Sequence, residues 1–227
     1  SFAKRLSMYV LRSKVSVQDV SEQWIISGYY NAQEQDSKLI LNPDELRLRL
    51  PNVLIDGHAQ SRVLIAKRIE NETGIFSEKD FLRWNNLEVL SAIPRIVLAT
   101  QEQFVPQMIN FESVAGIDFK KGCFPGQEIV ARSQYRGVIK RRLQLAHLEG
   151  SLDPQTYAPG VELFHSDDPT QPAGMVALSA ANPQKANRVD FQIECKLEAL
   201  EHGEIHLGSS EGPVLKIDSL PYPLIEI

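Results

Sequence analysis

The residue types best suited to chemistry lie in one short segment, residues 119–142. The segment contains the string Lys120-Lys121-Gly122-Cys123-Phe124-Pro125-Gly126-Gln127-Glu128. Two glycines and a proline within five residues predict a tight loop, and the residues from Gln127 to about Tyr135 favour a helix directly after it. The N–H groups at the start of a helix have no partner within the helix, so they suit an anion or a thiolate. The neighbouring lysines stabilise a thiolate as well, which makes Cys123 a candidate reactive thiol.

The same segment is strongly basic, although the whole chain is acidic. Residues 119–142 hold seven Lys and Arg against one acid, Glu128, and so carry +6, whereas the whole chain carries -5. A basic segment on an acidic body predicts a local anion site rather than a broad nucleic-acid surface. A solvated basic face is the plain alternative. Within the expected helix, Glu128 and Arg132 are spaced to pair on one face, and Arg136 extends that face by a turn.

The chain has two cysteines, and different roles are expected for them. Cys195 alternates with Phe191 and Ile193 in a β-type run, which predicts a place in the core. For Cys123, a small buried side chain is the alternative to a reactive thiol. Two isolated cysteines exclude a disulfide scaffold and a zinc site made of cysteine pairs.

Two histidine-containing segments could suggest other chemistry. The two histidines of His202–His206 are four residues apart, but Gly203 and a strand-like setting argue against a zinc helix. His165–Asp168 brings a histidine and acids together without the serine motif of a hydrolase. We therefore predict no metal site and no hydrolase triad.

The elements around the basic segment follow from hydrophobic spacing and turn residues. Ser77 and Asp80 open a predicted helix that carries Trp84 on its apolar face and ends before Pro94. The sequence Asn42-Pro43-Asp44-Glu45 predicts a short helix that ends near Leu50. Strands are predicted at residues 14–18, 23–30, 53–56 and 61–67, the last two joined by a turn at Gly57.

Composition and the last third of the chain complete the prediction of the fold class. After Gly150, frequent turn residues separate short β-type runs, which predicts a small β-barrel. The predicted runs are 161–165, 174–178, 189–195, 205–207 and 214–217. The whole chain of 227 residues is 43% hydrophobic, enough for a core, and has no apolar run near the ~20 residues of a membrane helix. The expected fold class is α+β, and the expected compartment is the reducing cytoplasm.

The string from Lys121 to Glu128, with Arg132 and Arg136-Gly137 downstream, resembles the signature of the YgfZ family. These folate-binding proteins are related to the T-protein, the aminomethyltransferase of the glycine-cleavage system. The resemblance continues at Phe104-Val105-Pro106 and at the closing Leu220-Pro221-Tyr222-Pro223. The cysteine in the string marks the YgfZ side of this relationship.

The resemblance implies a T-protein-like α+β fold in three parts. Residues 1–17 would be the end of a truncated first domain, the rest of which precedes residue 1. Residues 18–142 would form an α+β folate-binding domain with a ferredoxin-like layer, and residues 143–227 a C-terminal β-barrel.

The resemblance also implies tetrahydrofolate or a folate derivative as the cofactor. Trp84 resembles the family's folate-contacting tryptophan and would stack on the ring system. Lys120, Lys121 and Arg132 would bind the glutamate carboxylates of folate through charge-assisted hydrogen bonds. The implied cofactor-binding residues are Trp84, Lys120, Lys121, Gly122, Gly126, Gln127, Glu128, Arg132 and Arg136.

The function implied is that of a folate-dependent accessory protein for iron–sulfur enzymes, among them tRNA-thiolating ones, and through them of tRNA modification. Cys123 would be the reactive or cluster-facing group. One cysteine cannot hold a cluster that takes about four ligands, so no permanently bound cluster is expected. Two alternatives stay open, and so does the question of catalysis. One is a tetrahydrofolate-dependent aminomethyltransferase or demethylase, which needs a carboxylate beside the substrate amine. The other is a non-catalytic module that binds tRNA or a protein directly through the basic segment.

Overall fold

The fold combines helices with antiparallel sheets, so its class is α+β, as the sequence predicts. The computed structural model describes residues 2–31, 44–69, 77–122, 126–135, 137–150 and 153–225. The chain divides into two compact units. The first comprises Ser1–Asn52 and Gln60–Ile75, and the second comprises Val53–Ala59 and Phe76–Ile227.

The first unit is built on a three-stranded sheet in the order β1-β3-β2. A two-residue turn at Asp56 and Gly57 joins β2 to β3. Both turn residues have positive φ (48° and 80°), which suits the twist of a tight hairpin and favours glycine at the second position. The elements of this part of the chain are α1 (Phe2–Ser7), η1 (Ser21–Gln23), β1 (Trp24–Tyr30), β2 (Glu45–Ile55) and β3 (His58–Arg68).

Two sequence predictions in this part of the chain are wrong. The segment predicted as a helix from Asn42 to Leu50 is strand β2 in its described part. Leucines at 46, 48 and 50 alternate with arginines at 47 and 49, and this period of two outweighs the local helix-start signal. Residues 14–18 have no regular structure, because they join neither of the two described sheets.

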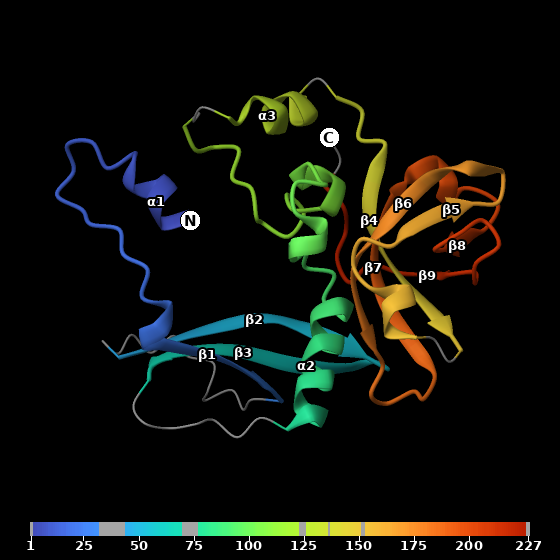
Figure 1. Ribbon diagram of the computed structural model, residues 1–227, viewed down its shortest axis with the longest axis horizontal. Helices are drawn as coiled ribbons and strands as arrows, with labels where there is room; N and C mark the ends of the chain where they lie inside the picture. The colour runs from blue at the N-terminus through green and yellow to red at the C-terminus, as the bar shows by residue number, and fades with distance from the viewer. Residues whose placement is uncertain are drawn as a thin grey trace. The chain divides into compact units, whose positions relative to one another are not determined.

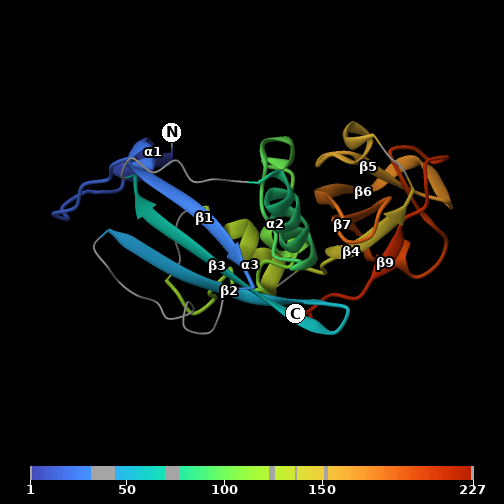
Figure 2. The same ribbon diagram turned by 90° about the horizontal axis from the view of Figure 1, so that it is seen from below.

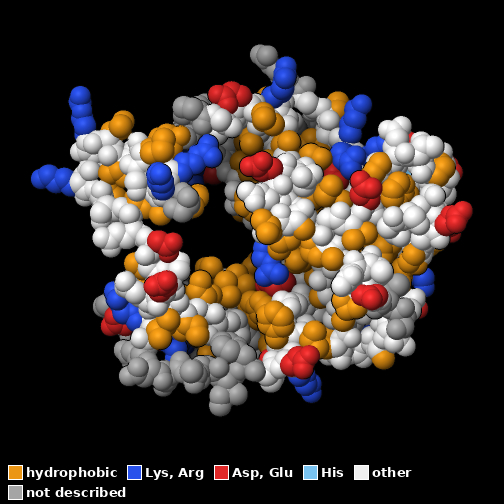
Figure 3. Space-filling view, viewed as in Figure 1, with side chains coloured by type: hydrophobic (Ala, Val, Ile, Leu, Met, Phe, Trp, Pro, Cys, Tyr) orange, Lys and Arg blue, Asp and Glu red, His pale blue; other side chains and the backbone are white. Residues whose placement is uncertain are grey.

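The three-stranded sheet keeps apolar side chains at its surface. Ile26 is 68% exposed, Leu48 is 55% exposed and Leu46 is 49% exposed. Figure 3 shows such apolar side chains, in orange, gathered over the region of this sheet. The sheet is therefore only partly covered by the described residues of its own unit.

The second unit is dominated by an antiparallel six-stranded sheet that curls into a half-barrel (Figure 1). The strand order is β8-β5-β6-β7-β4-β9. All five β-type runs predicted after Gly150 fall on or overlap these strands. The elements are β4 (Arg141–Glu149), η5 (Pro154–Tyr157), β5 (Glu162–His165), β6 (Asp168–Ala181), β7 (Arg188–Lys196), η6 (Leu197–Leu200), β8 (Ile205–Leu207) and β9 (Lys216–Asp218).

Strand β7 is buried on both faces, and its alternation sorts the two kinds of side chain. Val189, Phe191 and Ile193 enter the apolar core of the half-barrel. The residues between them, Asp190 and Gln192, point to the opposite face and are also almost fully buried. A strand covered on both sides normally has few polar residues, so these polar side chains need fixed partners.

Helix α2 (Glu78–Leu90) supplies those partners by packing against β6 and β7 (Figure 2). Asn86 donates a hydrogen bond to Asp190 at 2.7 Å. The Gln192 amide donates to the carbonyl oxygens of Glu88 and Val89, both at 3.0 Å, and so satisfies the last turn of the helix. The predicted cap is confirmed as well, since the Asp80 N–H donates to the Ser77 hydroxyl at 3.1 Å.

A buried ion pair joins β4 to the segment before the basic string. Arg142 is 5% exposed and pairs with Glu112, which is 3% exposed. Arg142 also donates to the Gln107 carbonyl at 3.0 Å and to the Ile225 carbonyl at 3.4 Å. Gln107 belongs to η4 (Pro106–Ile109), which follows η3 (Leu98–Thr100). One guanidinium thus connects the half-barrel, η4 and the C-terminal segment.

Replacing Arg142 with Met should destabilise the protein by about 3 kcal/mol or more, because it leaves the Glu112 carboxylate buried without its partner. Replacing Glu112 with Leu in the same chain should restore much of this loss. Chemical denaturation measures both. Lys216→Met removes an exposed pair to Glu149 and should change stability by less than about 0.5 kcal/mol. An equally small effect of Arg142→Met would contradict the role of the pair.

Cys195 is fully buried, as the sequence predicts, and burial raises the pKa of its thiol to about 12. In the unfolded chain the thiol ionises near its ordinary value of about 8.5, which stabilises the unfolded state at alkaline pH. Between pH 8 and pH 10 the wild type should therefore lose about 2 kcal/mol more stability than Cys195→Ala. Denaturation curves at both pH values test this difference. Equal losses in the two proteins would exclude a thiol that stays protonated in the fold.

Candidate functional site

The basic string leads into helix α3 (Glu128–Tyr135), which confirms the helix predicted after the loop. Before it, the Lys120 N–H donates to the Asp118 carboxylate at 2.9 Å, and the side chains of Lys120 and Lys121 are exposed. Gly126 has φ +98°, a left-handed conformation that favours glycine at this place in the string. The predicted residues Cys123 and Arg136 lie outside the described residues.

One side of α3 borders an open cavity of about 480 Å³. Positions 128, 129, 131, 132 and 135 repeat with helical spacing and so share one face of the helix. Within the described part of the chain, neither Glu128 nor Arg132 forms an ion pair, although their spacing allows one. The lining combines an acid, a base and apolar surface from Glu128, Ile129, Ala131, Arg132 and Tyr135.

Helix α3 is attached to the rest of its unit through η4. The Gln107 side-chain amide donates to the Val130 carbonyl in the middle of α3 at 2.8 Å. The main chain of Gln107 is in turn held by Arg142. At the last turn of α3, the Tyr135 ring meets the Phe119 ring edge-on, with 6.3 Å between their centroids. These contacts place the cavity-lining face of α3 relative to the half-barrel.

Two of the seven basic residues of segment 119–142 do not lie on a basic surface. The Arg141 guanidinium pairs with the buried Glu194 carboxylate, and this hydrogen bond raises the pKa of Arg141. Arg142 is buried with Glu112. The structure therefore neutralises part of the +6 charge with two acids that lie far away in the sequence. Among the described residues of segment 119–142, the basic side chains that remain exposed are Lys120, Lys121, Arg132 and Lys140.

The predicted cofactor residues are brought together only in part. Glu128 and Arg132 line the α3 cavity, and Gly122, Gly126 and Gln127 belong to the exposed chain that leads to it. Trp84 is half-buried on α2 and does not line this cavity. A folate contact of Trp84 stays a prediction.

Several residues of the site were not predicted from the sequence. Ile129, Ala131 and Tyr135 share the face of Glu128 and Arg132, and their helical spacing could have found them. No sequence pattern links Gln107 to α3, because the two are 23 residues apart and meet only in the fold. Two buried side-chain oxygens, Gln107 Oε1 and Gln134 Oε1, lack a hydrogen-bond partner among the described residues.

Two further findings bear on the class of site. In the described part of the chain, no group of three or more His, Cys, Asp or Glu is placed to hold a metal ion. Among the helices described, none is long and apolar enough to cross a membrane.

Comparison with known proteins gives relatives that share one name. The chain is 41% identical over 97 residues to the tRNA-modifying protein YgfZ of Photobacterium profundum, which is 43% of this chain and 29% of that protein. It is 40% identical over 87 residues to the protein of the same name from Vibrio vulnificus strain YJ016, which is 38% of this chain and 26% of the relative. It is 34% identical over 145 residues to that of Photorhabdus laumondii, which is 63% of this chain and 43% of the relative.

No family model matches the chain. The matched segments span between 26% and 43% of the lengths of these curated relatives. The three relatives are 34–41% identical to the chain over the matched residues. Over up to 63% of its length the chain is therefore similar to proteins named tRNA-modifying protein YgfZ.

Proposed function

We propose that this chain binds a folate at the α3 cavity and, like the relatives named as tRNA-modifying proteins, serves tRNA modification. The observation that carries this proposal is the lining of the cavity. On one helix face it offers apolar surface together with a guanidinium and a carboxylate that form no ion pair among the described residues. Folate needs the same three features, because it joins an aromatic pterin with N–H donors to a glutamate tail with carboxylates.

The residues present fit the two ends of a folate. Arg132 would bind a tail carboxylate through a charge-assisted pair, with Lys120 and Lys121 on the preceding chain adding positive charge. Glu128 would accept hydrogen bonds from pterin N–H groups.

The aromatic contact has two candidates. Tyr135 lines the cavity itself, with its side chain exposed. Trp84 is the residue that the family resemblance favours. Stacking on either ring would add about 1 kcal/mol beyond the area it buries.

A bound tetrahydrofolate would supply a carrier for a one-carbon group. In the sequence Cys123 lies between Lys121 and α3, the two parts of the chain that would bind the folate. We propose that the protein supports iron–sulfur enzymes, including those that thiolate tRNA, with Cys123 as its reactive group. A T-protein-like arrangement of the three domains expected from the sequence belongs to the same proposal.

A direct tRNA-binding module is the weaker function for this chain. That hypothesis relied on a +6 surface, but Arg141 and Arg142 are turned inward and paired. Fewer phosphate contacts mean a lower affinity and a weaker salt dependence. Among the described residues that line the α3 cavity, Glu128 supplies the one carboxylate that the aminomethyltransferase alternative could use.

Arg132→Met should weaken the binding of 5-formyltetrahydrofolate by about tenfold, because it removes the charge that pairs with the tail. Isothermal titration calorimetry of the 227-residue chain measures the affinity. Arg95 is an exposed arginine outside the cavity, so Arg95→Met is the matched control and should change the affinity less than twofold. No folate binding by the wild type, or equal losses in both variants, would refute the site.

The role of Trp84 can be measured separately by fluorescence, since the chain has only one other tryptophan, Trp24. In Trp24→Phe protein, all tryptophan fluorescence comes from Trp84. Folate that stacks on Trp84 should quench this emission, with the same dissociation constant as in calorimetry. Unquenched Trp84 emission, together with calorimetric binding that Tyr135→Ala weakens, would assign the stacking to Tyr135 instead.

A further inference from the structure

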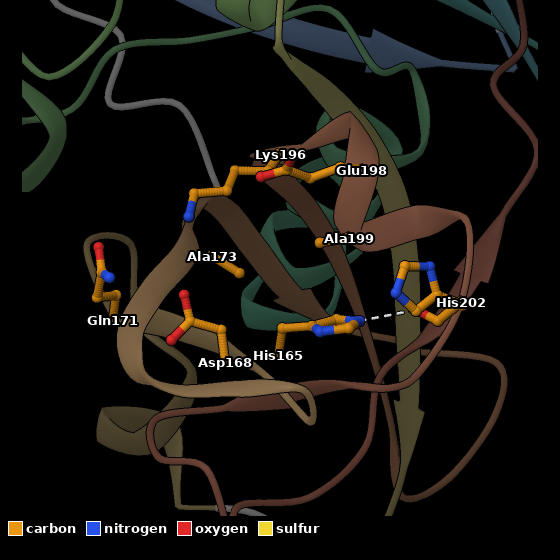
Figure 4. A pocket seen from close by; sticks show the side chains of 8 residues that line it. All are labelled: His165, Asp168, Gln171, Ala173, Lys196, Glu198, Ala199 and His202. Carbon is orange, nitrogen blue, oxygen red and sulfur yellow. Dashed lines mark hydrogen bonds between the residues drawn. The ribbon is translucent and has the colours of Figure 1, made fainter.

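A second cavity lies at one end of the half-barrel, where β5, β6 and β7 meet η6. Its volume is about 280 Å³. Its residues are outside segment 119–142, so a ligand of this cavity is independent of the proposed folate site. Figure 4 shows the lining side chains, which are His165, Asp168, Gln171, Ala173, Lys196, Glu198, Ala199 and His202.

The floor of this cavity is buried and fixed. Ala173, Ala199 and His165 are 2%, 7% and 6% exposed. The Nε2 atom of His165 lies 2.7 Å from the His202 carbonyl, and its Nδ1 atom accepts the Asp167 N–H at 3.2 Å. A carbonyl only accepts and an N–H only donates, so these partners assign a neutral imidazole with its proton on Nε2. Both ring nitrogens are therefore occupied.

The backbone around the floor allows the His165 ring to approach residues 202–203 closely. Gly203 has φ +71°, and a Cβ atom at that position would lie 2.6 Å from Nε2 of His165. The pairing of β5 with β6 shifts register twice, between Leu163 and Phe164 and between Phe164 and His165. Such bulges redirect side chains at the rims of barrels. The backbone around His165 thus sets the position of its ring at the floor of the cavity.

The walls carry opposite charges that do not neutralise each other. Lys196 at the end of β7 and Asp168 at the start of β6 are both half-buried and both line the cavity (Figure 4). Within the described chain, neither forms an ion pair, and Asp168 Oδ1 accepts only the Thr170 hydroxyl at 2.9 Å. Glu198 at the rim is likewise without an ion pair among these residues. Two carboxylates and one ammonium face the same space.

A metal ion does not explain this arrangement. The two nitrogens of His165 are used by the backbone, and His202 directs its Nε2 to Asp167 at 3.1 Å. In the described chain no cluster of metal-ligating side chains is found here. Charges of both signs in the lining instead match a ligand that carries both signs itself.

We propose that this cavity binds a free amino acid with a basic side chain. Lys196 binds the ligand carboxylate, and Asp168 and Glu198 bind its two cationic groups. The aliphatic part of the ligand lies on the floor made by Ala173, Ala199 and the His165 ring. This assignment pairs each of these three charges of the cavity with one charge of the ligand.

The test is a titration of the full chain with L-lysine, followed by amide chemical shifts in NMR. L-lysine should bind saturably and shift the amides of Ala173 and Ala199. Cadaverine lacks the carboxylate and norleucine lacks the side-chain ammonium, so each should bind about tenfold more weakly. No saturable binding of L-lysine, or equal binding of all three compounds, would overturn the proposal.

Variants then assign the charges. Lys196→Met should weaken L-lysine binding by about tenfold but leave cadaverine within about twofold, since only the carboxylate contact is lost. Asp168→Asn should weaken both ligands. Lys216→Met removes a lysine of the same half-barrel outside the cavity and should have no effect. A Lys196→Met protein that loses cadaverine as strongly as L-lysine would contradict the assigned role of Lys196.

Discussion

The buried pair of Arg142 and Glu112 is the contact on which the arrangement of the second unit depends. Two charges removed from water are costly unless each is fully partnered, so their neighbours must hold fixed positions. Arg142 meets this condition with the carbonyls of Gln107 and Ile225, and Gln107 in turn holds α3 through Val130. The helix that follows the basic string is therefore attached to a strand of the half-barrel by a short series of hydrogen bonds. The proposed folate site takes its position from this attachment.

The half-barrel can hold other elements because polar side chains on its strands point away from its apolar core. Strand β7 alternates between the apolar core and a polar face that binds α2. At its end, Lys196 pairs in register with Arg141, the first residue of β4. The chain that leaves α3 thus enters the sheet beside a residue of the second cavity. One sheet supports both candidate binding sites, although their chemistry differs.

Local signals in the sequence were sufficient for much of the fold. The Ser77 cap, the turn at Gly57 and the strand Ile205–Leu207 are determined by neighbouring residues, and the structure has all three. The first part of strand β2 was missed because its capping-like start resembles a helix, whereas its pairing in a sheet decides its conformation; the predicted strand at 53–56 overlaps the end of β2. The charge of segment 119–142 was overestimated for a related reason. Glu112 and Glu194, which neutralise Arg142 and Arg141, are 30 and 53 residues away, and no local pattern reveals such partners.

The proposed folate site predicts that two cysteines of one chain behave differently. Alkylation rates of Cys123 and Cys195 at neutral pH, measured by mass spectrometry with and without tetrahydrofolate, test this directly. Cys195 is the internal control, since burial raises the pKa of its thiol to about 12. Fast labelling of Cys123 that tetrahydrofolate slows would place a reactive thiol beside bound folate, as proposed. Slow labelling of both cysteines, unchanged by tetrahydrofolate, would contradict a folate site at the basic string and α3.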